Sequence, residues 1–241
     1  YGSLGRVRDA RRVFDEMPVR NEFSWAAMVA GYASTKCSEE AFEIFQLMLA
    51  ECPSQKNEFA ATAVLSAVSV PSGLPMGVQL HGLAVKDGLV VFVSVENSLV
   101  TMYAKAGCMD AALHVFASSK ERNSITWSAM ITGYAQNGNA ESAFRMFLQM
   151  LSAGFSPTEF TLVGVLNACS DVGALMEGKQ THGLMVKLGL EAQVYVKSAL
   201  VDMYAKCGCI TDAKEGFHQF HELDIVLWTA MVAGHVQNGE H

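Results

Sequence analysis

The chain has 241 residues, of which 51% are apolar and 17% charged, and its formal net charge is −7. This composition is ample for a buried core. The acidic balance gives no support to a protein that holds nucleic acid mainly by neutralising phosphates, since such domains are usually basic. The longest apolar run, residues 89–95, ends at Glu96 and is too short to span a membrane. We expect no membrane segment.

Two residue types could indicate special chemistry. The six cysteines lie at Cys37, Cys52, Cys108, Cys169, Cys207 and Cys209. No C-x-x-C and no histidine pair with ligand spacing accompanies them, so we expect free thiols, no metal and no cofactor. A basic cluster near the N-terminus consists of Arg6, Arg8, Arg11, Arg12 and Arg20. We interpret it as an exposed, solvated helix face.

The elements repeat along the chain. Trp25, Trp127 and Trp228 lie 102 and 101 residues apart, and residues 102–108 (MYAKAGC) return at 203–209 as MYAKCGC. Each long period contains three different helical hairpins. In chain order, the predicted units are 1–21 (partial), 22–57, 58–92, 93–123, 124–158, 159–193, 194–224 and 225–241 (partial). Both ends are expected to be cut within a repeat.

The unit at 124–158 shows the pattern most clearly. One apolar stripe at helical spacing consists of Trp127, Met130, Ile131, Tyr134 and Ala135, and a second consists of Ala143, Phe144, Phe147, Met150 and Leu151. Between them, Gly138 is typical of a left-handed helix end and Asn139 of an N-cap. One hairpin cannot cover both stripes, so neighbouring hairpins must stack on it. The fold class predicted is all-α, a right-handed superhelical solenoid of about seven antiparallel helix pairs.

The unit lengths and the motifs WSAMITGYAQNG, NACSDVGALMEGKQTHG and LVDMYAKCG resemble those of the pentatricopeptide repeat proteins of land plants. The order of unit types is similar to their PLS subclass. Units 22–57, 124–158 and 225–241 resemble P repeats, 58–92 and 159–193 L repeats, and 1–21, 93–123 and 194–224 S repeats. The resemblance implies a superhelix that binds single-stranded organellar RNA, one base per repeat.

In that family, two residues of each repeat choose the base. The fifth residues here are Ala26, Thr62, Asn97, Ser128, Val163, Ser198 and Thr229, and the last residues are Asn57, Phe92, Asn123, Thr158, Gln193 and Asp224. Ala26, Val163 and Phe92 cannot make side-chain hydrogen bonds, so their repeats are expected to act as spacers. The resemblance implies a pyrimidine for Asn97 with Asn123, guanine for Ser198 with Asp224, and a purine for Ser128 with Thr158.

The second residue of each repeat packs against a base in that family. Those residues are Phe23, Phe59, Ser94, Ile125, Phe160, Tyr195 and Val226. Six of the seven are apolar or aromatic, and we expect these six to stack on bases. Judged by residue type alone, the alternative is an ordinary core position at a helix start.

No catalytic centre is visible in the sequence. The segment from Gly173 to Lys179 has phosphate-loop spacing but continues with Gln180 instead of the required Ser or Thr. His81 and His182 recur at one repeat position without a carboxylate or cysteine partner at fixed spacing, which indicates packing or loop hydrogen bonds. The H-x-E and C-x-x-C motifs of zinc deaminases are absent. We therefore do not expect an enzyme.

The function that the resemblance implies is that of a specificity factor for C-to-U RNA editing or other RNA processing, in a mitochondrion or chloroplast, working with a deaminase or other editing-complex proteins. A tetratricopeptide-like scaffold that binds proteins is the alternative, and the acidic charge would suit it. Dimerisation through the open repeat ends is a further alternative for this chain.

Overall fold

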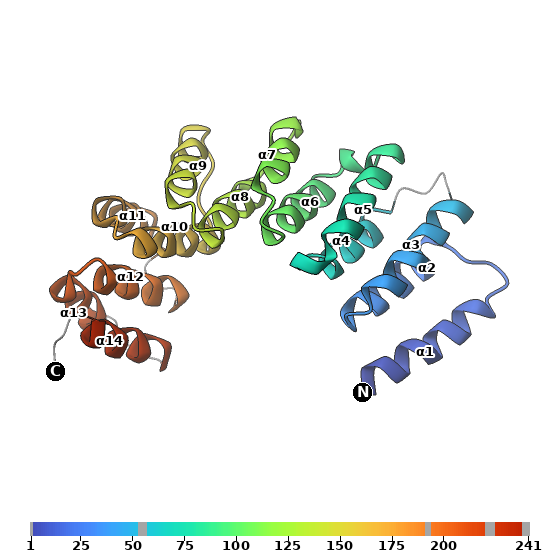
Figure 1. The fold of residues 1–241 in the computed structure, drawn as a ribbon, viewed down its shortest axis with the longest axis horizontal. Coiled ribbons are helices and arrows are strands. Elements are labelled where there is room, and N and C mark those ends of the chain that lie inside the picture. The colour runs from blue at the N-terminus through green and yellow to red at the C-terminus, as the bar shows by residue number, and fades with distance from the viewer. Residues whose placement is uncertain (1, 53–56, 191–193, 220–224, 238–241) are drawn as a thin grey trace. The chain divides into compact units, whose positions relative to one another are not determined.

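The computed structural model describes residues 2–52, 57–190, 194–219 and 225–237, and the chain divides into two compact units, residues 1–121 and 122–241. Each unit is described by itself. All regular elements in the described residues are helical (Figure 1). The fold prediction of an all-α chain is therefore confirmed.

The first unit contains seven α-helices and two short 3₁₀ helices among its described residues. They are α1 Gly2–Asp15, α2 Glu22–Ser34, α3 Ser38–Glu51, α4 Glu58–Ala67, η1 Pro71–Gly73, α5 Leu74–Lys86, η2 Leu89–Val91, α6 Val93–Lys105 and α7 Met109–Ser118. Helix α2 packs on α1, α3 and α4, and α6 packs on α4, α5 and α7. The first helices of the hairpins thus form one layer, and the second helices cover its other side.

The second unit repeats this arrangement. Its helices are α8 Ser124–Gln136, α9 Ala140–Ser152, α10 Glu159–Val172, α11 Leu175–Leu188, α12 Val194–Lys206, α13 Ile210–Gln219 and α14 Ile225–Gln237. The inner layer runs from α8 to α10, α12 and α14, each packed on the next, while α9, α11 and α13 pack on the helices that precede and follow them. Among the described residues, contacts run between neighbouring hairpins, as a solenoid requires.

Capping chemistry fixes where these helices begin and end. Gly138 has a φ of +73°, and the Asn139 side chain accepts a hydrogen bond from the backbone N–H of Ser142 at the start of α9. Pro75 lies in the first turn of α5, where a missing N–H costs no helical hydrogen bond. The first helices of the hairpins begin at residues 22, 58, 93, 124, 159, 194 and 225, which are the first residues of the predicted units.

The buried residues follow the apolar stripes. Met130 and Ile131 of α8 and Ala143 and Met150 of α9 are fully buried, and Phe147 is 2% exposed. No helix within the described residues is long and apolar enough to cross a membrane. The core therefore lies between the two helix layers and leaves the second residue of α2, α4, α8, α10 and α12 at the surface.

Candidate functional site

In both units, apolar side chains in the first turn of inner helices are exposed to solvent. Exposed fractions are 74% for Phe23, 74% for Phe59, 62% for Ile125, 75% for Phe160 and 69% for Tyr195. We call these five residues the exposed row. Val226, the sixth apolar residue predicted at this position, lies outside the residues whose side chains the structure describes. Such exposure excludes the alternative that the described members of the row are core residues.

Within each unit, successive members of the exposed row come from helices that pack on one another. The second residue is Phe23 in α2 and Phe59 in α4 of the first unit. In the second unit it is Ile125 in α8, Phe160 in α10 and Tyr195 in α12. In place of an apolar residue, α6 has Ser94, whose hydroxyl donates to the Glu58 carboxylate. An exposed aromatic face offers a nucleobase roughly 1–3 kcal/mol of stacking free energy.

The face beside the exposed row is hollowed in the second unit. One hollow of about 270 Å³ is lined by Thr132, Gln136, Phe160, Val163 and Asn167, among others. A second, of about 500 Å³, is lined by Val163, Asn167, Tyr195, Ser198, Asp202 and Thr229, among others. Each hollow thus has one aromatic residue of the exposed row and several hydrogen-bonding groups on its walls. A flat, polar-edged ligand suits such a surface.

The structure brings one predicted base-reading pair into contact. Ser128 of α8 and Thr158, the N-cap of α10, lie 3.1 Å apart between their hydroxyl oxygens. Thr161, one turn into α10, contacts both: its Oγ1 lies 2.5 Å from Ser128 Oγ and 3.0 Å from Thr158 Oγ1. Ser128 and Thr161 are buried, while Thr158 is half-buried. The sequence pattern did not single out Thr161.

Two of the three predicted asparagine readers, Asn57 and Asn123, also cap helices. Asn57 is 8% exposed; its Oδ1 accepts from the backbone N–H of Ala60 and its amide donates to the carbonyl of Glu22. Both ends of this amide are therefore used inside the protein. Asn123 caps α8 by accepting from the Thr126 N–H and is half-buried. Asn97 is half-buried on α6, in the other unit.

The remaining predicted readers differ in exposure. Thr62 and Thr229 donate to the carbonyls of Phe59 and Ile225, one helical turn back, and Thr229 is exposed. Ser198 is 7% exposed. Two further predicted readers lie outside the described residues. They are Asp224, the predicted partner of Ser198, and Gln193, the last residue of the repeat at 159–193.

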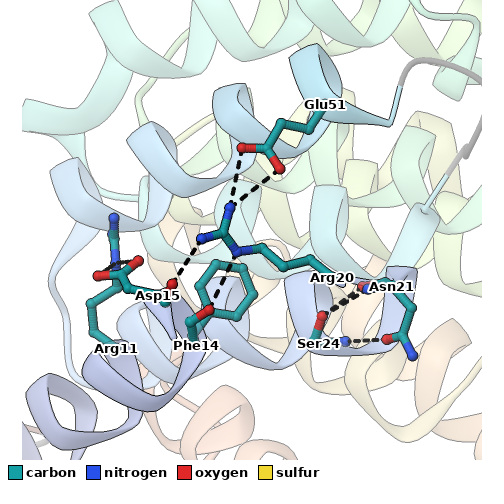
Figure 2. Close-up of polar contacts among 7 residues, drawn as sticks. All are labelled: Arg11, Phe14, Asp15, Arg20, Asn21, Ser24 and Glu51. Atoms are coloured by element: carbon teal, nitrogen blue, oxygen red, sulfur yellow. Dashed lines mark hydrogen bonds and ion pairs between the residues drawn. The ribbon is translucent and has the colours of Figure 1, made fainter. Parts of the chain in front are cut away.

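The N-terminal arginines are partly engaged by the protein itself. Figure 2 shows Arg20 donating to the carboxylate of Glu51 at 3.3 Å and to the backbone carbonyls of Phe14 and Asp15. Its guanidinium also lies over the rings of Phe14 and Trp25. The prediction of a solvated face is therefore wrong for Arg20, because this side chain joins the end of α1 to α2 and α3.

Other arginines of that cluster pair with carboxylates on the same helix. Arg11 binds Asp15 at 2.8 Å, and Arg12 lies 3.7 Å from Asp9. These ion pairs lower the positive charge that α1 presents. Together with the net charge, they leave apolar and hydrogen-bonding contacts as the chief means by which the described face could hold a ligand.

The groups that we do not expect to be catalytic have structural partners. Lys179 lies 3.0 Å from Asp212, whose hydrogen bond raises the lysine pKa, and Gly173 ends α10 with a φ of +68°. His81 Nδ1 lies 2.9 Å from Tyr103 Oη, and His182 Nδ1 lies 3.0 Å from Tyr204 Oη. Burial lowers the pKa of His81 and so favours its neutral form. The packing interpretation of both histidines is confirmed.

The cysteines are free thiols, as predicted. Within the described residues, no group of three or more His, Cys, Asp or Glu side chains is placed to hold a metal ion. The polar groups that line the hollows beside the exposed row are hydroxyls, amides and the carboxylates of Asp171 and Asp202, and the hydroxyls and amides can recognise a ligand edge by hydrogen bonds.

Two family models match the chain. The one described as "PPR repeat family" matches residues 122–171, and the one described as "PPR repeat" matches residues 1–21, 23–52 and 97–124. Together the two models cover residues 1–21, 23–52 and 97–171. They include Phe23, Ile125 and Phe160 of the exposed row.

Curated relatives align along the whole chain. Pentatricopeptide repeat-containing protein At2g33680 of Arabidopsis thaliana is 47% identical over 100% of the chain, which covers 33% of that protein. From the same plant, the chloroplastic protein At1g11290 is 38% identical over 99% of the chain and the mitochondrial protein At3g09040 is 35% identical over 99%, with 29% and 23% of those proteins covered. The chain spans about a third or less of the length of these relatives.

Solved structures share the fold. The pentatricopeptide repeat protein PPR10 from maize has a TM-score of 0.64 and 22% identity, with 95% of this chain and 34% of that chain covered. The complex of PPR10 with an 18-nt psaJ RNA element has a TM-score of 0.61 and 20% identity, with 97% of this chain and 40% of that chain covered. At these identities the likeness establishes the solenoid fold alone.

Proposed function

Since the chain belongs to the pentatricopeptide repeat proteins of plant type, we propose that it binds single-stranded RNA along the exposed row, with one base at each repeat. The observation that carries this proposal is the exposure of Phe23, Phe59, Ile125, Phe160 and Tyr195, at 62–75%, at the same position of successive helices. Large apolar side chains rarely stand in solvent in so regular an order without a ligand to cover them.

Stacking explains how an acidic chain can bind RNA. Bases in single-stranded RNA expose their faces and edges, whereas in a duplex both are occupied by neighbouring bases. The exposed row supplies faces, and the hollows beside Phe160 and Tyr195 supply hydrogen-bonding walls for the edges. The net charge of −7 makes phosphate neutralisation the smaller contribution. Binding should therefore favour single strands over duplexes.

Base choice is proposed for the repeats that have polar side chains at both reading positions. Ser128 with Thr158, Asn97 with Asn123, and Ser198 with Asp224 are these pairs. Asn57 is left out because its repeat has Ala26 at the other reading position, and its own amide is bonded on both sides within the protein. The repeats that have Ala26, Val163 or Phe92 at a reading position would contribute stacking without base selectivity.

The cellular role follows from the order of unit types. We infer a PLS-type repeat array, which supports a role as a specificity factor for C-to-U editing or other RNA processing beside a deaminase or another editing protein. Relatives named as chloroplastic and as mitochondrial support an organellar location. The family matches favour RNA binding over the tetratricopeptide-like scaffold.

Substitution of the exposed row tests the proposal. Phe160→Ala or Tyr195→Ala should weaken binding to a random-sequence single-stranded RNA pool by about tenfold or more, because each removes a stacking surface worth roughly 1–3 kcal/mol. Fluorescence anisotropy measures the affinity. Circular dichroism should show unchanged helicity, since both side chains are exposed and leave the core intact.

Met176→Ala is the matched control. Met176 is 66% exposed on α11, in the outer layer. Its replacement by alanine therefore removes a similar apolar side chain from another face of the same unit. RNA affinity should stay within about twofold of the parent's, as expected for a surface substitution worth under about 0.5 kcal/mol. An equal loss for Met176→Ala, or no loss for Phe160→Ala, would show that the exposed row does not hold RNA.

A further inference from the structure

The hydroxyl groups of Ser128, Thr158 and Thr161 form a triangle in which the number of protons is limited. Ser128 Oγ donates its one proton to the Ser124 carbonyl at 2.6 Å. It can therefore only accept from Thr161, at 2.5 Å, and from Thr158, at 3.1 Å. A buried hydroxyl with this set of partners has no proton to offer a base.

Thr161 is placed to donate to Ser128. Its Oγ1 accepts from the backbone N–H of Thr158 at 3.1 Å, and its own proton has two acceptors within reach, Ser128 Oγ at 2.5 Å and Thr158 Oγ1 at 3.0 Å. The shorter contact is the stronger one. Thr161 is fully buried, so no ligand competes for this proton.

Thr158 is then the hydroxyl whose proton can turn outward. Its Oγ1 accepts from the backbone N–H of Thr161 at 3.3 Å, and its contacts to the other two hydroxyls, at 3.0 and 3.1 Å, are the longest of the three. It is also the member of the triangle that is half-buried instead of buried. A base acceptor approaching from the surface can replace either long contact.

We propose that Thr161 is a specificity-determining positioning residue of the repeat at 124–158. By donating to Ser128, it leaves Thr158 available as the hydrogen-bond donor toward the base. Without the Thr161 hydroxyl, Ser128 would have one donor left within reach, Thr158, which would turn inward. This inference rests on the proposed RNA-binding function and assigns the base contact within that repeat.

Valine replacement at Thr161 tests this assignment. Thr161→Val keeps the shape of the side chain and removes the hydroxyl, whereas Thr161→Ser keeps the hydroxyl. The 241-residue parent and each variant are used to select bound sequences from a random single-stranded RNA pool. Thr161→Val should lower the enrichment of the preferred base at one nucleotide by about two- to tenfold, the worth of one neutral hydrogen bond. Thr161→Ser should restore the parent's preference.

The control is Thr126→Val. Thr126 is the equally buried residue in the first turn of α8, and its hydroxyl accepts from the Asn123 N–H just as Thr161 does from Thr158. Both valine variants lose the same capping contact and should lose similar stability in thermal unfolding. Thr126→Val must leave the nucleotide affected by Thr161→Val unchanged.

The outcomes separate this inference from the proposed function. A parent that selects no RNA would refute the RNA-binding function itself. If the parent selects RNA and Thr161→Val keeps the parent's preference at every nucleotide, RNA binding stands and the role of Thr161 is refuted. A change that Thr126→Val reproduces at the same nucleotide would also refute it, because the effect would then come from lost capping.

Discussion

For single residues, burial determines which side chains can bind a ligand or react. Residue types at fixed spacing predicted the caps, the left-handed glycine at Gly138 and the free thiols, since these depend on neighbours a few residues away. The position of the Arg20 side chain depends on its contact with Glu51. The hydroxyl triangle joins Ser128 to residues that lie 30 and 33 positions later in the chain. Such contacts follow from hairpin stacking, so sequence spacing within one helix could not predict them.

Burial also decides which thiols can react. Cys169 is 2% exposed, and burial, with smaller contributions from Glu177 and Cys207, raises its pKa to about 12. Because the thiolate is the reactive form, native protein treated with iodoacetamide at about pH 8 should leave Cys169 unlabelled. Cys37, Cys52 and Cys108 are partly exposed. Mass spectrometry should find Cys169 labelled in denaturant only; native labelling at the rate of Cys37 would contradict the burial.

At the scale of helices, the second helix of a hairpin approaches the next inner helix closely at a recurring glycine. Gly178 of α11 faces Met203 of α12, and Gly77 of α5 faces Met102 of α6; both methionines are fully buried. A Cβ at Gly178 would lie 2.7 Å from Met203 Cε, and one at Gly77 would lie 2.6 Å from Met102 Sδ. A side chain at either position would therefore require the buried methionine to shift.

The same helix supplies a control for this contact. Gly178→Ala should lower the free energy of unfolding by about 1–3 kcal/mol, the usual cost of overpacking a core. Gly183→Ala, also on α11, meets nothing within 4 Å and should raise it by up to about 1 kcal/mol through helix propensity. Urea unfolding followed by circular dichroism measures both. Equal effects of the two substitutions would contradict the close packing of α11 on α12.

At the scale of the whole molecule, periodicity made the fold predictable. A repeat that must stack on its neighbour constrains both of its helices, and the first helices begin at the residues that the repeat pattern indicated. The site was less predictable. The aromatic residue type at position 160 is compatible with either a buried or an exposed side chain. Only the stacked structure shows that Phe160 is exposed. Which bases are read depends on hydrogen-bond directions that composition does not reveal.

Site-specific crosslinking can show whether consecutive repeats hold consecutive bases. A photoreactive phenylalanine analogue is introduced at position 160 in one protein and at position 195 in another, since these exposed side chains begin the packed helices α10 and α12. Each is crosslinked to the same selected single-stranded RNA, and the modified nucleotide is mapped by reverse transcription. If consecutive repeats hold consecutive bases, the crosslinks should fall at two adjacent nucleotides. Crosslinks at one shared nucleotide, at nucleotides far apart, or equally to duplex RNA would contradict it.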